Sequence, residues 1–286
     1  MKQFISVAIT AMLWSGSSAL AINIPTDGTT EIPAAPAFAD VEMANTYDFK
    51  GILSLSGCSG SLVRFDDSEP TDKGLVLTNG HCVELINPDK VIINRRDNRS
   101  FGVLDTNAKK IGSLRASRLL YATMTKTDLA LYELKDSFEE IDERFDISPL
   151  TLSRDYAEVG DDIEVISGYW KRGYSCEVEA FAYSLKEGDW FFKDAIRYSR
   201  PGCEVIGGTS GSPVILRGTR TVIAVNNSIN ARGGKCTLNN PCEISADNKI
   251  TYEKGYGYAQ QTSWLYGCRG QQQILKLEKP GCILPK

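Results

Sequence analysis

Three residues that lie far apart in the sequence, His81, Asp128 and Ser210, could together carry out nucleophilic chemistry. His81 is the only histidine of the chain and follows a short apolar run. A serine hydroxyl is a poor nucleophile at neutral pH and needs a nearby base that titrates in the same range, which histidine provides. An aspartate that orients the imidazole completes a triad for acyl transfer.

Each residue also has an ordinary structural interpretation. A lone histidine can lie on a surface or in a core, and an aspartate before a strand is usually a turn or capping residue. Ser210 lies in a glycine-rich segment that can be one more surface turn. The sequences around the three residues decide between these interpretations.

The sequence around His81 resembles the histidine motif of the trypsin/chymotrypsin-like peptidases, in which a strand is followed by Thr-Ala-x-His-Cys. Here the strand is followed by Thr-Asn-Gly-His-Cys over 78–82, a variant similar to bacterial secreted members. The resemblance implies a later Asp-(Ile/Leu)-Ala-Leu segment, supplied by 128–131, and then Gly-x-Ser-Gly-(Gly/Ser)-Pro, supplied by 208–213. The order His, Asp, Ser differs from that of the α/β-hydrolases and the subtilisins.

The resemblance implies a role for each residue. His81 would take the proton of Ser210 and return it to the departing amine, while Asp128 would hold the imidazole in the useful tautomer. The backbone N–H groups of Gly208 and Ser210 would form the oxyanion hole. Ser212 is a rival nucleophile, but the motif places the reactive serine first. The predicted function is a serine endopeptidase; the alternative is a protease-like binding protein without catalysis, although such proteins commonly lose the histidine or serine that is kept here.

Two positions bear on activation and specificity. In the digestive trypsins an aspartate before the reactive serine pairs with a newly cut N-terminus, but here Thr209 occupies that place, so this activation is not expected. Glu204, six residues before the serine, stands where trypsin has the acidic residue that attracts Lys or Arg, but Cys203 is displaced and leaves the register uncertain. The other expected substrate-binding residues are Asn226, Ser228 and Gly257.

Short β-type runs separated by Gly, Asn, Asp and Pro turns predict an antiparallel all-β fold. The resemblance makes this two packed antiparallel β-barrels of the trypsin-like fold with the active site between them. Residues 46–145 would form the first barrel, with His81 and Asp128, and residues 146–286 the second, with Ser210 and the C-terminal tail. The charged segment 136–144 is expected to be a helix or loop, and segments 260–266 and 271–278 are candidates for a short C-terminal helix.

The N-terminus predicts export. A positive start, an apolar stretch and small residues before Ala21 are the parts of a cleavable signal peptide over 1–21. The apolar stretch is shorter than the roughly 20 residues that a membrane span needs. Residues 22–45, rich in Pro, Ala and Thr, are predicted to be a flexible leader, either an inhibitory propeptide or a spacer. We therefore expect a secreted protein, or a periplasmic one if the source is a Gram-negative bacterium.

The 8 cysteines all follow the signal segment, and an even number in an exported chain predicts disulfides. The resemblance assigns Cys58 to Cys82, because the sequence around Cys58 looks like the strand that faces the histidine segment in the family. Eight cysteines allow about 105 pairings, so the remaining bonds stay open. The plausible pairs are Cys176 with Cys203, Cys236 with Cys242, and Cys268 with Cys282.

Composition argues against several other functions. With a net charge of −4, 42% hydrophobic and 24% charged residues, the chain is an ordinary globular protein without the basic surplus typical of nucleic-acid binding. One histidine and no Cys-x-x-Cys pair predict no metal site, and the acidic residues of 66–72 are better explained as a solvated turn than as a calcium site. We expect a monomer that acts on polypeptide substrates, with no cofactor, nucleic acid or membrane as partner.

Overall fold

The computed structural model describes residues 47–270 and 273–286. The predicted signal peptide over 1–21 and the predicted leader over 22–45 lie outside the described residues. Within the described ranges, no helix has the length and apolar character needed to cross a membrane.

The first barrel closes as an antiparallel ring in the order β1-β5-β6-β7-β3-β2, because β1 pairs with both β5 and β2. Its strands are β1 Ile52–Ser54, β2 Ser59–Arg64, β3 Lys73–Thr78, β4 Val91–Arg96, β5 Ser100–Leu104, β6 Lys110–Thr123 and β7 Leu129–Ser137. Successive side chains of a strand point to opposite faces. Leu75 and Leu77 of β3 accordingly pack in one apolar cluster, and Val76 packs in another. Both faces of the strand that leads to His81 are therefore fixed by packing.

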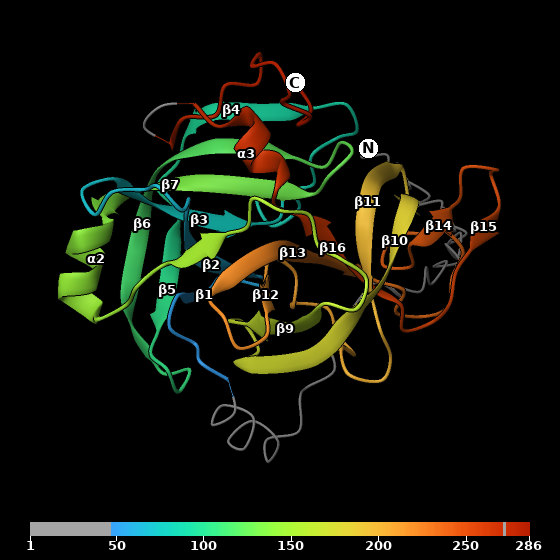
Figure 1. Ribbon diagram of the computed structural model, residues 1–286, viewed down its shortest axis with the longest axis horizontal. Helices are drawn as coiled ribbons and strands as arrows, with labels where there is room; N and C mark the ends of the chain where they lie inside the picture. The colour runs from blue at the N-terminus through green and yellow to red at the C-terminus, as the bar shows by residue number, and fades with distance from the viewer. Residues whose placement is uncertain (1–46, 271–272) are drawn as a thin grey trace, which may run out of the picture. The chain divides into compact units, whose positions relative to one another are not determined.

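The second barrel closes in the order β13-β12-β9-β10-β11-β16 through the pairing of β16 with β13. Its strands, with the outlying β14 and β15, are β9 Asp162–Ser167, β10 Arg172–Glu187, β11 Trp190–Tyr198, β12 Pro213–Leu216, β13 Thr221–Ile229, β14 Cys242–Ile244, β15 Ile250–Thr251 and β16 Gly257–Gln261. Strand β8, Leu150–Leu152, pairs in parallel with β2 and β13 and so connects the barrels (Figure 1). The all-β, two-barrel prediction is confirmed.

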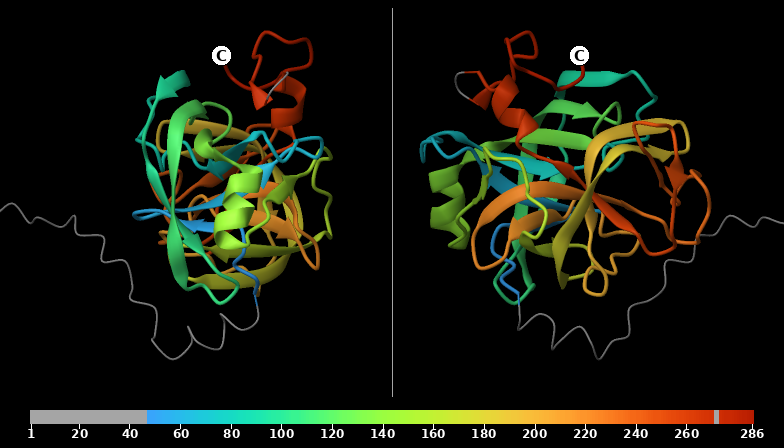
Figure 2. Two further views of the ribbon diagram at one scale, coloured as in Figure 1. Left: turned by 90° about the vertical axis from the view of Figure 1, so that its left-hand side faces the viewer. Right: turned by 45° about the vertical axis from the view of Figure 1, so that its right-hand side comes forward.

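Two helices accompany the barrels. Helix α2, Phe138–Phe145, begins with a capping box between Ser137 and Glu140, and this charged segment is a helix rather than a loop. It lies beside the first barrel, on the side away from the second (Figures 1 and 2). The short C-terminal helix α3, Trp264–Cys268, begins inside the segment predicted from 260, because β16 runs to Gln261. The prediction of a helix over 271–278 is wrong for residues 274–278, where Leu275 forms an isolated antiparallel bridge with Arg269 and a turn follows that buries Leu277.

Four disulfides join the same pairs that the sequence favoured. They are Cys58–Cys82, Cys176–Cys203, Cys236–Cys242 and Cys268–Cys282. The first holds the histidine segment against the first residues of β2. The third closes a loop of the second barrel that covers part of the site described next.

Candidate active site

His81 lies three residues after the end of β3 and is held by contacts with Asp128. The side-chain amide of Asn79 donates to the Asp128 carbonyl at 2.8 Å, and the His81 backbone N–H donates to Asp128 Oδ1 at 3.0 Å. Gly80 passes so close to the backbone that a Cβ there would lie 2.1 Å from the carbonyl oxygen of Thr123. Asn79 is therefore required for a hydrogen bond to the Asp128 segment, and Gly80 for its close approach to Thr123.

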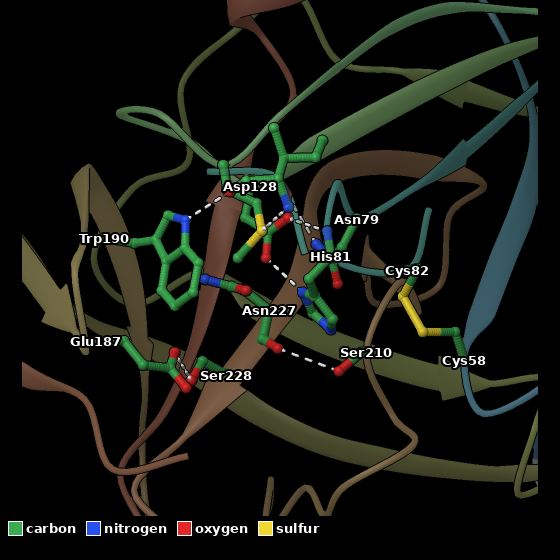
Figure 3. A network of polar contacts seen from close by, with 12 residues as sticks. Cys58, Asn79, His81, Cys82, Asp128, Glu187, Trp190, Ser210, Asn227 and Ser228 are labelled. Carbon is green, nitrogen blue, oxygen red and sulfur yellow. Dashed lines mark hydrogen bonds and ion pairs between the residues drawn. A yellow bond between two sulfur atoms is a disulfide. The ribbon is translucent and has the colours of Figure 1, made fainter. Parts of the chain in front are cut away.

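Asp128 lies just before β7 and is 1% exposed. Its Oδ2 lies 2.5 Å from His81 Nδ1, and both carboxylate oxygens thus contact the histidine (Figure 3). The preceding loop is held from the other barrel, because the Lys126 N–H donates to the Phe191 carbonyl at 3.0 Å and the Lys193 N–H donates to the Lys126 carbonyl at 2.7 Å. The β10–β11 hairpin therefore fixes the position of Asp128.

The imidazole of His81 is in an electrostatic setting suited to a general base. Burial disfavours its charged form, but the negative charge and hydrogen bond of Asp128, together with the charge of Glu187, prevail and raise its pKa above the ordinary value of 6.5. Asp128 oriented in this way favours a proton on Nδ1, which leaves Nε2 free to accept one.

Ser210 lies in a turn that packs against the first barrel. Its carbonyl accepts from the Ser59 N–H at 2.7 Å, and the N–H of Gly211 donates to the Asn226 carbonyl at 2.9 Å. The Ser210 hydroxyl donates to the Asn227 carbonyl at 3.3 Å, and no hydrogen bond to His81 is formed within the described ranges. Figure 3 shows the two side chains facing one another. The rival Ser212 is fully buried and does not line the cavity.

The two N–H groups expected to form the oxyanion hole form no hydrogen bond with other described residues. In the described part of the chain, the N–H groups of Gly208 and Ser210 donate to no protein acceptor, whereas that of Thr209 donates to the Ile206 carbonyl at 3.0 Å. Gly208 has φ +90°, and a Cβ there would meet Trp170 Nε1 at 2.8 Å. Thr209 is fully buried, and its hydroxyl accepts from the Ile206 N–H at 3.3 Å. A local hydrogen bond thus occupies the place where the digestive trypsins have an ion-paired aspartate.

One cavity of about 190 Å³ brings the three residues together. It is lined by His81, Leu85, Met124, Asp128, Glu187, Trp190, Phe192, Val205, Ile206, Gly207, Ser210, Asn226, Asn227, Ser228, Ile229, Leu238 and Asn239. Asn226 and Ser228 lie where we expected substrate contacts. Gly257 lies behind the wall rather than on it, because a Cβ there would meet Val205 Cγ2 at 3.0 Å.

Glu204 is not in the cavity. It is exposed, and its carboxylate accepts from the Gly202 N–H at 3.0 Å, a local turn contact. The carboxylate that lines the cavity beside His81 and Asp128 belongs to Glu187 instead. No local sequence motif predicted Glu187. It lies at the end of β10 in the second barrel, whereas His81 and Asp128 belong to the first.

Among the described residues, one group with metal-ligand spacing lies beside His81. The sulfur atoms of Cys58 and Cys82 lie close to the His81 ring, but they are joined in a disulfide and are not thiolate ligands.

The sequence matches the family described as a trypsin-like peptidase domain over residues 58–225, more than half of the chain. The chain belongs to this family. The matched range of the trypsin-like peptidase domain includes all three candidate catalytic residues. No curated protein matches the chain.

Solved structures similar to this trypsin-like peptidase domain include three bacterial proteases. The protease domain of MamO from Magnetospirillum magneticum is 12% identical, with a TM-score of 0.47, and the match covers 76% of this chain and 94% of that one. Nocardiopsis protease is 14% identical, with a TM-score of 0.43 and coverages of 74% and 90%. Protease Anisep from Arthrobacter nicotinovorans is 14% identical, with a TM-score of 0.43 and coverages of 75% and 91%.

Proposed function

We propose that this trypsin-like peptidase domain is an exported serine endopeptidase that forms an acyl-enzyme at Ser210. The observation that carries the proposal is that Ser210 and the His81–Asp128 pair line the same cavity. In the proposed reaction, His81 Nε2 accepts the Ser210 proton while Oγ attacks the peptide carbonyl, and the Gly208 and Ser210 N–H groups stabilise the oxyanion. His81 then returns the proton to the departing amine. Water releases the acyl group in the second half.

Export is supported by the four disulfides, since such bonds persist in oxidising compartments. The N-terminal pattern described above agrees with it.

The alternative, a catalytically inactive binding protein, takes its support from the Ser210 hydroxyl, which donates to Asn227 instead of His81. Catalytic hydrogen bonds are often long in free enzymes and tighten only when substrate binds, so this contact does not argue strongly against catalysis.

Covalent labelling separates the two functions. A fluorophosphonate probe is expected to modify the purified leader-free protein at Ser210, as mapped by mass spectrometry of its peptides, because only an activated serine reacts readily. Ser210→Ala should not be labelled. Ser212→Ala, the matched control at a buried serine of the same loop, should retain labelling at Ser210. A correctly folded protein that the probe leaves unmodified would favour the binding-protein alternative.

The pH dependence follows from the raised pKa of His81. Because Asp128 stabilises the imidazolium, His81 holds its proton to a higher pH than a free histidine, and activity is expected to rise with pH through a midpoint above 6.5. As the only histidine of the chain, His81 can be titrated directly by NMR of its ring. The NMR midpoint and the acid limb of kcat/KM should coincide. A midpoint below 6.5 would contradict the predicted electrostatics.

A further inference from the structure

Glu187 is the last residue of β10. Among the described residues, two carboxylates line the cavity, Asp128 and Glu187. Glu187 is 8% exposed, so the protein places an acidic group almost out of solvent beside the candidate catalytic residues. Figure 3 shows it with Ser228 across the site from the Cys58–Cys82 bond. A buried carboxylate is unfavourable unless polar or charged partners compensate for its lost hydration.

Two hydrogen bonds hold the Glu187 carboxylate in place. The Ser228 hydroxyl donates to Oε2 at 2.5 Å, and the Asn239 N–H donates to Oε1 at 2.7 Å. Asn239 lies in the loop closed by the Cys236–Cys242 disulfide, and that loop is joined to the hairpin by a bond from the Gly188 N–H to the Cys236 carbonyl at 3.0 Å. Each carboxylate oxygen keeps a further acceptor site. The carboxylate is therefore positioned rigidly without being saturated.

The charge balance of the cavity is negative. Its only lining residues with titratable side chains are Asp128, Glu187 and His81, and no Lys or Arg of the described chain lines it. Asp128 is paired with His81, and Glu187 forms no ion pair within the described residues. Neutral partners compensate a buried carboxylate only in part, so a cation would complete the compensation of Glu187.

A second polar group points to an occupant next to Glu187. Asn227 is 4% exposed and lines the cavity, and its Nδ2 has no hydrogen-bond partner among the residues that the structure describes. Asn227 lies between Ser210 and Ser228. Its backbone carbonyl accepts from the Ser210 hydroxyl, and the Ser228 hydroxyl donates to Glu187. A peptide that passes from Ser210 towards Glu187 along β13 would offer this amide a carbonyl acceptor.

We propose that Glu187 binds the positively charged side chain of a lysine or arginine near the scissile bond of the substrate. This inference rests on the proposed peptidase function and names the substrate class that the site selects. The cation would form a charge-assisted hydrogen bond in a site that excludes most water. Glu187, rather than the exposed Glu204, then determines any preference for basic side chains.

Glu187 also acts on the imidazole, since its negative charge contributes to the raised pKa of His81. That effect is the same for every substrate, because it acts on the general base. Recognition of a cation acts only on substrates that carry one. A comparison of charged and neutral side chains of the same shape therefore separates the two effects.

The test uses peptides that differ only by arginine or its neutral analogue citrulline, placed in turn at each of four positions on either side of the cleaved bond. For the wild-type protein, kcat/KM should favour arginine by roughly 10- to 100-fold at one position, the range expected for a hydrogen bond to a charged group. Glu187→Gln should bring that ratio close to one. Glu204→Gln, the matched control at an exposed glutamate, should leave the ratio unchanged.

Several results would overturn the inference. Suppose that the protein is labelled at Ser210 and cleaves peptides, but that its kcat/KM for arginine and citrulline is nearly equal at every position. This result would contradict the role of Glu187 and leave the proposed peptidase function unaffected. A ratio that responds to Glu204→Gln and not to Glu187→Gln would transfer the role to Glu204. A protein that neither labels nor cleaves would instead remove the proposed function itself.

A measurement on the wild-type protein keeps the inference testable if Glu187→Gln does not fold. Burial raises the pKa of Glu187, so the arginine-to-citrulline ratio should fall as the pH is lowered through that raised pKa. The other groups acting on Glu187 are His81 and Asp128, which affect both substrates equally, and the neutral Ser228 and Asn239. A ratio that does not change with pH down to the acid limit of the fold would contradict the role of Glu187.

Discussion

Replacing Asp128 by asparagine is expected to lower kcat/KM by about 10⁴-fold, as loss of the orienting carboxylate does in other enzymes with this triad. The side chain keeps its shape, and Oδ1 can still accept from the His81 N–H as it does now. The second position becomes an NH₂ group that faces His81 Nδ1, where a carboxylate oxygen now lies at 2.5 Å. Two donors cannot share this contact, so the imidazole must carry its proton on Nε2.

That change of tautomer is what makes the effect large. With a proton on Nε2, His81 can no longer accept one from Ser210, although every residue of the site is still present. Ring NMR reports the change directly, because no other histidine contributes a signal. Asp155→Asn makes the same chemical change at an exposed position and should alter neither activity nor tautomer. If Asp128→Asn keeps the Nδ1 proton or most of its activity, Asp128 does not have the proposed role.

Local motifs account for how much of this site could be predicted. Each of the three candidate catalytic residues lies within three residues of a short apolar strand: His81 after β3, Asp128 before β7 and Ser210 before β12. The local sequence therefore contains both the residue and the strand that positions it. Cys58 and Cys82 follow from the same segments. Short β-type runs between Gly, Asn, Asp and Pro turns likewise predicted the strands, because barrel strands are defined by residues close together in the chain.

The second carboxylate of the cavity, Glu187, could not be predicted in the same way. Glu187 reaches the cavity only because the β10–β11 hairpin crosses to the first barrel, where Phe192 packs in a cluster with Ile86 and Met124. No spacing within the chain encodes that contact. Glu204 lies six residues before Ser210 in the chain, but its side chain is exposed and accepts from the Gly202 N–H. Tertiary packing, not local sequence, decides which carboxylate lines the cavity.

The same hairpin connects Glu187 with the segment that carries Asp128. Its backbone holds the loop of Lys126, next to Asp128, and its end carries Glu187. The indole N–H of Trp190 donates to the Ile86 carbonyl at 2.8 Å and fastens the hairpin to the first barrel. A disturbance of the hairpin should therefore affect the general base and the substrate site together.

Replacing Gly211 by alanine is expected to destabilise the fold by about 3 kcal/mol or more, because two separate costs combine. Gly211 has φ +79°, a conformation that costs an alanine about 1 kcal/mol. A Cβ there would also lie 2.1 Å from the Ser59 carbonyl oxygen and 2.3 Å from Thr78 Oγ1. Neither group can move freely, since Ser59 begins β2 and Thr78 ends β3.

Gly218→Ala isolates the steric part of this cost. Gly218 has a closely similar φ of +74°, but a Cβ there would meet nothing within 4 Å. It should lose only the backbone cost of about 1 kcal/mol, and the free energies of unfolding from urea denaturation give the difference directly. Gly211→Ala should also slow fluorophosphonate labelling, because the contact of this turn with β2 and β3 sets the position of Ser210 relative to His81. Equal losses of stability in the two variants would show that the Ser210 turn is not held as tightly against the first barrel as these contacts indicate.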